Sequence, residues 1–134
     1  MPPPRPTSNF AVTYRCNSRC KICGIWRTVD PGKGEMPLEE IEGILSENRG
    51  FLKDVTSIQV TGGETYLRED FPVLIHATRG RLPRTTIWIP TNGLTPRRIE
   101  AATREMLHDN DGIRLGVSVS IDGIRCTHDA IRGI

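Results

Sequence analysis

Short runs rich in β-branched residues alternate with longer amphipathic stretches along this sequence. Strands are predicted over residues 10–14, 55–61, 86–89 and 115–121. From the second strand onward they recur about every 30 residues, which is the size of a βαβ unit. Strands that alternate with helices imply a parallel sheet with helices packed against it. The pattern therefore predicts an α/β fold, and both an open doubly wound sheet and a barrel satisfy it.

Helix signals fill the intervals between these strands. Helices are predicted to begin where a proline stands in the first turn or an apolar stripe starts, at Pro37, Phe71 and Pro96. Gly50 offers a stop for the first helix, and Pro83 follows the end of the second. A fourth helix is expected to open at residues 132–134, where the sequence ends.

Composition excludes several classes of protein. The 134 residues are 37% hydrophobic and 25% charged, as in an ordinary single globular domain. A net charge of +2 gives no footprint for nucleic acid or an anionic membrane. No apolar run approaches the roughly 20 residues of a membrane span, and no secretory signal is present. Residues 1–8 are interpreted as a flexible arm and residues 9–134 as the domain.

The fourth predicted strand has two unlike faces. One face is apolar and the other is small and polar, the two sets being Leu115, Val117, Val119 and Ile121 against Gly116, Ser118, Ser120 and Asp122. Gln59 and Thr61 give the second strand a similar polar face. Parallel strands buried on both sides are usually apolar throughout. Small polar side chains on a shared inner face therefore predict a ligand cavity, and an edge strand with one wet face is the alternative.

Three of the four cysteines, Cys16, Cys20 and Cys23, fall within eight residues, and Cys126 lies about a hundred positions away. Two disulfides are one interpretation, but uneven spacing without a signal peptide favours reduced, metal-binding thiols in the cytoplasm. Thiolates suit iron–sulfur clusters, zinc or Cu(I). Three close cysteines leave one iron of a cubane cluster without a protein ligand, whereas a pure electron carrier supplies four. A zinc site completed by His128 or Cys126 is the alternative.

The carboxyl ends of the later strands carry short polar segments. The second strand ends in Gly62-Gly63-Glu64, where glycines allow close backbone approach to a ligand and the carboxylate can accept bonds from an ammonium group. Taken alone, this segment is also typical of a plain turn. Asn92 follows the third strand, and Ser120 and Asp122 end the fourth. Ligands of parallel α/β folds bind at this edge of the sheet.

Together these segments resemble the radical S-adenosylmethionine (SAM) superfamily. The spacing C-x3-C-x2-C, with Ile22 before its last cysteine, is similar to the superfamily's signature, and Gly62-Gly63-Glu64 resembles its GGE motif, although Thr65 stands where proline often follows. Thr91-Asn92-Gly93 also resembles a superfamily segment. The runs 120–123 and 128–133 resemble the subfamily of sulfatase maturases and molybdenum-cofactor cyclases.

The resemblance implies the N-terminal portion of a partial (β/α)6 TIM-like barrel, about four strand–helix units and apparently truncated. It implies a [4Fe-4S] cluster held by Cys16, Cys20 and Cys23. It places Ile22 near the adenine of S-adenosylmethionine and the GGE motif at the amino group. Asn92, Ser120 and Asp122 are expected to lie near the same ligand.

The resemblance also implies the reaction. A reduced cluster cleaves S-adenosylmethionine, and the 5′-deoxyadenosyl radical abstracts hydrogen from a substrate, a peptide or a cofactor precursor. The partners implied are that substrate and an external electron donor such as flavodoxin or ferredoxin. Two rivals are a non-catalytic iron–sulfur or zinc module and a remnant that needs a partner chain. The four-strand piece alone is expected to be poorly stable and inactive, with an exposed edge.

Other reactive side chains are interpreted as structural. Cys126 is expected in the loop after the fourth strand, away from any ligand role. His76 and His108 fall in predicted helices and are expected to be solvated and unpartnered. Trp26 follows the cysteine loop and is expected to pack under it.

Overall fold

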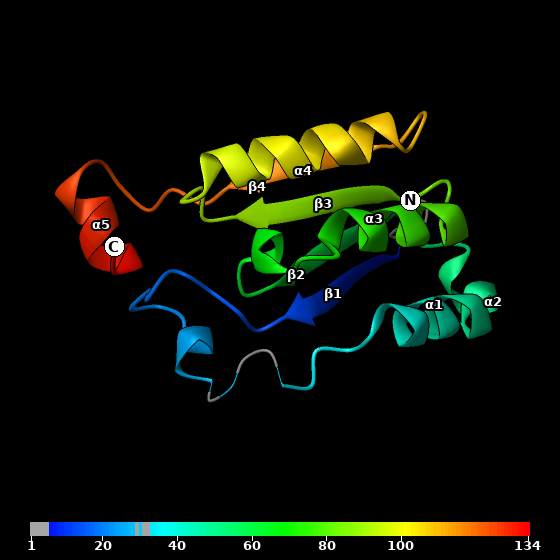
Figure 1. The fold of residues 1–134 in the computed structure, drawn as a ribbon, viewed down its shortest axis with the longest axis horizontal. Coiled ribbons are helices and arrows are strands. Elements are labelled where there is room, and N and C mark those ends of the chain that lie inside the picture. The colour runs from blue at the N-terminus through cyan, green and yellow to red at the C-terminus, as the bar shows by residue number, and fades with distance from the viewer. Residues whose placement is uncertain (1–5, 29, 31–32) are drawn as a thin grey trace, which may run out of the picture.

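The computed structural model describes residues 6–28, 30 and 33–134. Its centre is a four-stranded parallel sheet in the order β1-β2-β3-β4 (Figure 1), with strands β1 Thr7–Thr13, β2 Ser57–Gly62, β3 Thr86–Thr91 and β4 Leu115–Val119. Each crossover returns the chain to the strand beside the previous one. The carboxyl ends of all four strands therefore lie at one edge, in the order of the sequence.

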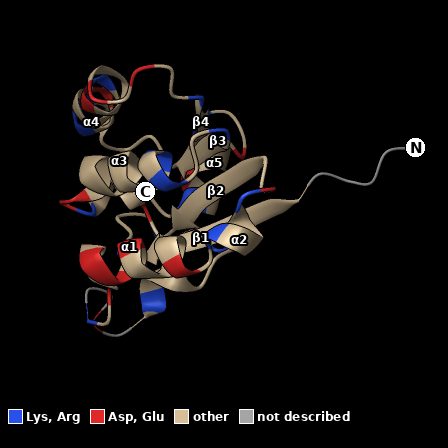
Figure 2. Cartoon of the chain, turned by 90° about the vertical axis from the view of Figure 1, so that its right-hand side faces the viewer, with Lys and Arg blue, Asp and Glu red and all other residues tan. Residues whose placement is uncertain are grey.

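The helices are α1 Leu38–Glu47, α2 Arg49–Leu52, α3 Phe71–Arg81, α4 Pro96–His108 and α5 Cys126–Arg132, with single 3-10 turns at Ile25–Arg27 and Thr65–Leu67. Figure 2 shows α1, α3 and α4 on the same side of the sheet. Doubly wound sheets carry helices on both faces. Helices that cover only one face of a sheet are typical of the wall of a barrel. Of the two expected architectures, the arrangement therefore favours the barrel over the open doubly wound sheet. No helix of the described residues is long and apolar enough to span a bilayer.

The core lies between this covered face and the helices. Alternation along the strands supplies one side of it, with Ile58 and Val60 buried on β2 and Ile87 and Ile89 buried on β3. Helix residues complete it, among them Ile41, Leu45, Phe71, Leu74, Ile75 and Met106. Because apolar burial is the main stabilising term, this layer fixes the sheet and leaves its other face free for ligands.

Strand β1 begins earlier than the sequence predicted. It starts at Thr7, so Thr7 and Ser8 pair with β2 instead of belonging to the arm. Residues 1–5 of the predicted arm lie outside the described residues. The predicted stop at Gly50 is wrong, because α1 ends at Glu47 and Gly50 lies inside α2. The amide of Asn48 donates to the carbonyl of Ile44 at 2.9 Å and ends α1 there.

The fourth helix was predicted to open at the end of the sequence, and this prediction is wrong. The segment before it already forms α5, which ends where Gly133 adopts a left-handed conformation with φ 67°. Cys126 is the first residue of that helix instead of part of a loop. In Figure 1, α5 stands at the carboxyl end of the sheet, beside the cysteine loop and away from the other helices.

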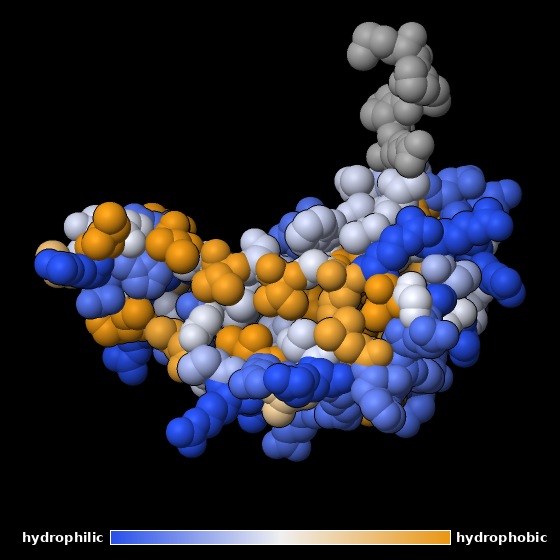
Figure 3. Space-filling view, turned by 90° about the horizontal axis from the view of Figure 1, so that it is seen from above, coloured by the Kyte–Doolittle hydropathy of each residue, from blue (hydrophilic) through white to orange (hydrophobic). Residues whose placement is uncertain are grey.

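The two faces of β4 differ as predicted only in part. Leu115 packs on the core, but Val117 and Val119 are exposed because no described element covers the end of this edge strand. Figure 3 shows hydrophobic residues as a band along this side of the molecule. On the other face, Gly116 is small for a local reason: a Cβ there would come within 2.4 Å of the Trp88 ring.

Candidate metal and cofactor site

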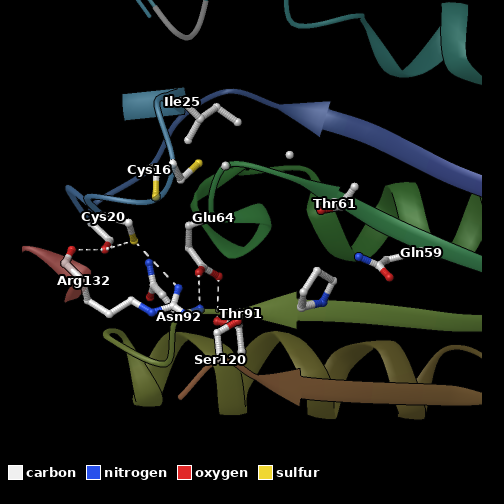
Figure 4. Close-up of a pocket in the computed structure, with 15 residues that line it drawn as sticks. Cys16, Cys20, Ile25, Gln59, Thr61, Glu64, Thr91, Asn92, Ser120 and Arg132 are labelled. Atoms are coloured by element: carbon white, nitrogen blue, oxygen red, sulfur yellow. Dashed lines mark hydrogen bonds between the residues drawn. The ribbon is translucent and has the colours of Figure 1, made fainter. Parts of the chain in front are cut away.

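A cavity of about 210 Å³ opens at the carboxyl ends of the strands. The cysteine loop, the ends of β2, β3 and β4, and α5 all contribute to its lining (Figure 4). Of the residues predicted to form the site, it gathers Cys16, Cys20, Cys23, Gly62, Gly63, Glu64, Asn92 and Ser120. Gln59 and Thr61 line it too, so the polar inner face of β2 borders a cavity as predicted. Five segments of the chain thus meet at one place.

The three cysteines differ in exposure. Cys20 is buried, Cys16 is half-buried and Cys23 is exposed. Burial raises the pKa of the Cys16 thiol above its usual value, a backbone hydrogen bond from Ser18 opposes that shift, and the nearby charge of Glu64 adds to it. Trp26 donates its indole N–H to the carbonyl of Cys20 at 3.1 Å. It therefore packs against the cysteine loop, as predicted.

The cysteines do not converge on a single point. Across the described residues, no three His, Cys, Asp or Glu side chains are arranged to hold one metal ion. A tetrahedral zinc site needs such convergence. The ligands of a cubane bind different corners of the cluster, so three separated thiols facing one cavity fit a cluster better than a single ion.

The paired glycines bring β2 against the backbone that leads into the cysteine loop. Gly63 donates its N–H to the carbonyl of Thr13 at 2.8 Å, and Glu64 donates to the carbonyl of Arg15 at 2.7 Å. A Cβ on Gly63 would lie 2.0 Å from the Arg15 oxygen. The glycines were expected to admit a ligand. In the structure they line the cavity, but the close approach that requires them is to the β1 extension.

Glu64 is fixed at the centre of the site. Its side chain is buried, with 1% of the residue exposed. One carboxylate oxygen accepts a hydrogen bond from the Thr91 hydroxyl at 2.8 Å and the other accepts one from the Asn92 N–H at 2.7 Å. Each oxygen keeps a further lone pair for a ligand. The carboxylate is therefore an oriented acceptor on the wall of the cavity (Figure 4).

Asn92 and Ser120 reach the cavity from β3 and β4. The amide of Asn92 donates to the side-chain oxygen of Asn17 at 2.7 Å, so it ties the end of β3 to the cysteine loop. The N–H of Ser120 donates to the carbonyl of Thr91 at 2.9 Å, which extends the β3–β4 ladder by one bond. These contacts place both side chains beside Glu64.

Two predicted residues do not line the cavity. Ile22 is 74% exposed. Asp122 forms an ion pair with Arg132, and its N–H donates to Nδ1 of His128 at 3.2 Å. The positions of Ile22 near adenine and of Asp122 near the ligand therefore stay predictions.

The residues interpreted as bystanders lie mostly as expected. Cys126 is exposed at the start of α5, and His76 is exposed on α3. His108 is exposed on α4 but is not unpartnered, because its Nδ1 lies 2.8 Å from a carboxylate oxygen of Asp109.

Comparison with known proteins assigns the family. The model of the radical SAM superfamily matches residues 10–133, nearly the whole chain. The chain belongs to the radical SAM superfamily. The cofactors of that superfamily are a [4Fe-4S] cluster and S-adenosylmethionine, as the resemblance implied, and its members are enzymes.

Two curated relatives of this radical SAM chain are similar over nearly all of it. The pre-heme d1 synthase of Dinoroseobacter shibae is 33% identical over 98% of the chain, and the Fe-coproporphyrin III synthase of Methanosarcina barkeri is 31% identical over 97%. The chain spans only 30% of the length of each relative.

Two solved structures share the fold. Streptococcus suis SuiB bound to S-adenosylmethionine superposes with a TM-score of 0.74 at 19% identity, over 96% of this chain and 28% of SuiB. BtrN in complex with AdoMet and 2-DOIA gives a TM-score of 0.65 at 21% identity, over 93% of this chain and 49% of BtrN. The predicted fold class, an α/β fold of parallel strands that alternate with helices as in a partial TIM-like barrel, is thereby confirmed.

Sequence reasoning missed three polar residues of this radical SAM site. Arg132 and Thr91 lie in segments that carried the resemblance, and Ser18 lies inside the cysteine loop, but none was given a role. Arg132 is the informative omission, because it brings a guanidinium to the rim of a cavity that already holds a buried carboxylate. An oriented carboxylate and a guanidinium facing one space can bind the two charges of an amino-acid group.

Proposed function

We propose that this chain is the cluster-binding part of a radical SAM enzyme. Cys16, Cys20 and Cys23 would hold a [4Fe-4S] cluster, and S-adenosylmethionine would bind beside it in the same cavity. When bound, this pair supplies one-electron cleavage to a 5′-deoxyadenosyl radical, which abstracts hydrogen from the substrate. The observation that carries the proposal is the meeting of the three thiols, Glu64 and Ser120 around one cavity.

The protein residues bind and orient the methionine end of S-adenosylmethionine. Glu64, whose two oxygens are already fixed by Thr91 and Asn92, accepts from the ammonium group. Arg132 and Ser120, which line the same cavity, donate to the carboxylate. Because the carboxylate and the guanidinium are held before the ligand arrives, little ordering is needed on binding.

The test is anaerobic reconstitution of the chain with iron and sulfide, followed by low-temperature EPR of the reduced protein. A cubane signal that changes when S-adenosylmethionine is added supports an open iron and a working cofactor site. A cluster signal that ignores S-adenosylmethionine supports the non-catalytic iron–sulfur module instead. Zinc without any cluster overturns the proposal.

For the substrate, a tetrapyrrole precursor is favoured over a peptide. Both curated relatives are named as synthases of tetrapyrroles, at 33% and 31% identity. SuiB, which was crystallised with its precursor peptide SuiA, shares the fold at only 19% identity. The full-length protein is expected to form 5′-deoxyadenosine faster with a porphyrin precursor than with a peptide, as mass spectrometry would measure. An external donor such as flavodoxin or ferredoxin would supply the electron, and the reduced, metal-binding cysteines support a cytoplasmic location.

A further inference from the structure

The Cys20 sulfur has contacts with two side chains that the chemistry above does not use. Ser18 is buried, with 1% of the residue exposed, and its hydroxyl lies 3.0 Å from the Cys20 sulfur. Nη1 of Arg132 lies 3.8 Å from the same sulfur, within the range for a hydrogen bond to sulfur. Two potential donors therefore approach one of the three proposed cluster ligands.

Both donors are held in place by the end of α5. The Ser18 hydroxyl lies 2.7 Å from the carbonyl of Arg132, and the N–H of Lys21 donates to the carbonyl of Ile131 at 2.8 Å. Contact is tight enough that a Cβ on Gly133 would lie 2.4 Å from the carbonyl of Arg19. The last turn of the chain is thus packed directly on the cysteine loop.

Which group donates the hydrogen bond between Ser18 and Cys20 depends on whether the sulfur is a thiol or a cluster-bound thiolate. A Cys20 thiol can donate to Ser18, whose own hydrogen then reaches the Arg132 carbonyl. A cluster-bound thiolate has no hydrogen and can only accept. The single hydrogen of the buried Ser18 hydroxyl can then turn from the Arg132 carbonyl toward the sulfur, and the guanidinium of Arg132, which has only donors, also favours the thiolate.

We infer that Ser18 and Arg132 are positioning residues that donate hydrogen bonds to the Cys20 sulfur in the loaded site and raise the reduction potential of the cluster. This inference rests on the proposed function, because it requires Cys20 to be a ligand. Donors to cluster sulfurs stabilise the reduced, more negative cluster, so their removal makes reduction harder.

The midpoint potential of the reconstituted full-length protein tests this role. Ser18→Ala is expected to shift the potential to a more negative value at unchanged iron content, and Ser18→Thr, which keeps the hydroxyl, to restore it. Adding Arg132→Met to Ser18→Ala lowers it further. Thr28→Val, an exposed position beyond the loop, is the matched control and leaves it unchanged. A fully loaded Ser18→Ala protein with the wild-type potential overturns the inference.

A second measurement needs no cluster. In the apo protein, iodoacetamide is expected to alkylate buried Cys20 several-fold more slowly than exposed Cys23, as peptide mass spectrometry would show. Gly133→Ala, which displaces the end of α5, should raise the rate at Cys20 and leave Cys23 as it was. Equal alkylation rates of Cys20 and Cys23 in the wild-type chain would contradict the packing of α5 on the cysteine loop. If the wild-type chain takes up no cluster, the proposed function is overturned as well. If the chain takes up the cluster but Ser18→Ala leaves its midpoint potential unchanged, only the inferred effect on the potential is overturned.

Discussion

A buried carboxylate is costly unless every oxygen has a partner, and Glu64 meets that condition with donors from β3. The arrangement prevents the side chain from turning away from the cavity. It also makes the residue sensitive to a change that keeps its shape, since an amide offers one acceptor oxygen instead of two and loses the negative charge that an ammonium group would meet.

Glu64→Gln is therefore expected to weaken S-adenosylmethionine binding at least about tenfold and to destabilise the fold by about 1–3 kcal/mol. Calorimetric titration of the reconstituted protein and thermal unfolding measure the two effects. Glu69→Gln, an exposed neighbour on the same segment, is the control and changes neither. Wild-type affinity in Glu64→Gln would remove this residue from the cofactor site.

Cys23 is exposed, so its removal separates ligation from folding. Cys23→Ala is expected to lower the iron content after reconstitution and to change the free energy of unfolding by no more than about 0.5 kcal/mol. Cys126→Ala, an equally exposed thiol, keeps full iron content. If Cys126→Ala lost iron to the same degree, Cys126 would have to be counted among the ligands.

Much of the site at this scale could be predicted from local patterns. The spacing of the cysteines predicts a metal site, and the GGE segment predicts a ligand site, each from a few consecutive residues. Arg132 could not be found this way, because its contact with the cysteine loop joins residues 112 positions apart in the sequence. Thr91 was missed for a similar reason, since its role is to fix Glu64 on the neighbouring strand, 27 positions away.

Among the elements, Arg68 joins three parts of the chain. It donates to the carbonyl of Val12 on β1 at 2.8 Å, to the carbonyl of Met36 ahead of α1 at 3.0 Å, and to Asp70 at the start of α3. Hydrogen bonding to Arg68 holds the pKa of Asp70 below its usual value. The end of β1, and with it the cysteine loop, depends on this connection.

The Arg68–Asp70 pair makes stability depend on pH. Because the folded-state pKa of Asp70 is depressed, its stabilisation is complete above the unfolded pKa, about 3.9, and is lost as the pH falls through the lower folded value. Asp70→Asn is expected to cost about 1 kcal/mol at pH 7, since the carboxylate is partly exposed. The difference from wild type should vanish in acid. Urea unfolding from pH 7 to pH 2.5 measures it, and a pH-independent difference would contradict the pairing.

The approach of β2 to the β1 extension predicts a strong effect at Gly63. Gly63→Ala is expected to move the cysteine loop, lower cluster uptake and destabilise the chain by about 2 kcal/mol or more, because the added carbon meets a backbone oxygen at 2.0 Å. Gly80→Ala in α3 has free space and should instead stabilise by about 0.5–1 kcal/mol. Iron content and thermal unfolding of the pair provide the measurement. Tolerance at Gly63 would mean that the two backbones can separate.

The sequence predicted the long strands and helices closely, but it did not predict the short helices. Strands β2, β3 and β4 and helices α3 and α4 were predicted within a few residues, because alternation and helical stripes specify a buried face. The short helices α2 and α5 bury no residue, so no stripe marks them. The helix stop predicted at Gly50 was wrong for the same reason, since a glycine is tolerated inside an exposed helical turn.

For the whole molecule, the uncovered edge is the main liability. Val117, Val119 and Ile121 are exposed along and beyond β4, where a parallel neighbour could pair. The 134-residue chain is expected to self-associate at micromolar concentration, and Val119→Lys should reduce association, as light scattering would measure. Leu107→Lys adds the same charge on exposed α4 and serves as the control. An equal effect of both substitutions would assign the association to net charge instead of the edge.

The contact between Ser18 and Arg132 joins residues 114 positions apart. A ribosome adds about 5–20 residues per second, so the cysteine loop is synthesised roughly 6–23 s before the helix that shields it. During that interval Cys20 has no cover from α5 and is open to iron carriers and oxidants alike. Cys20 is therefore accessible to solvent during synthesis. A cluster can be delivered most easily in this interval, before α5 packs on the cysteine loop.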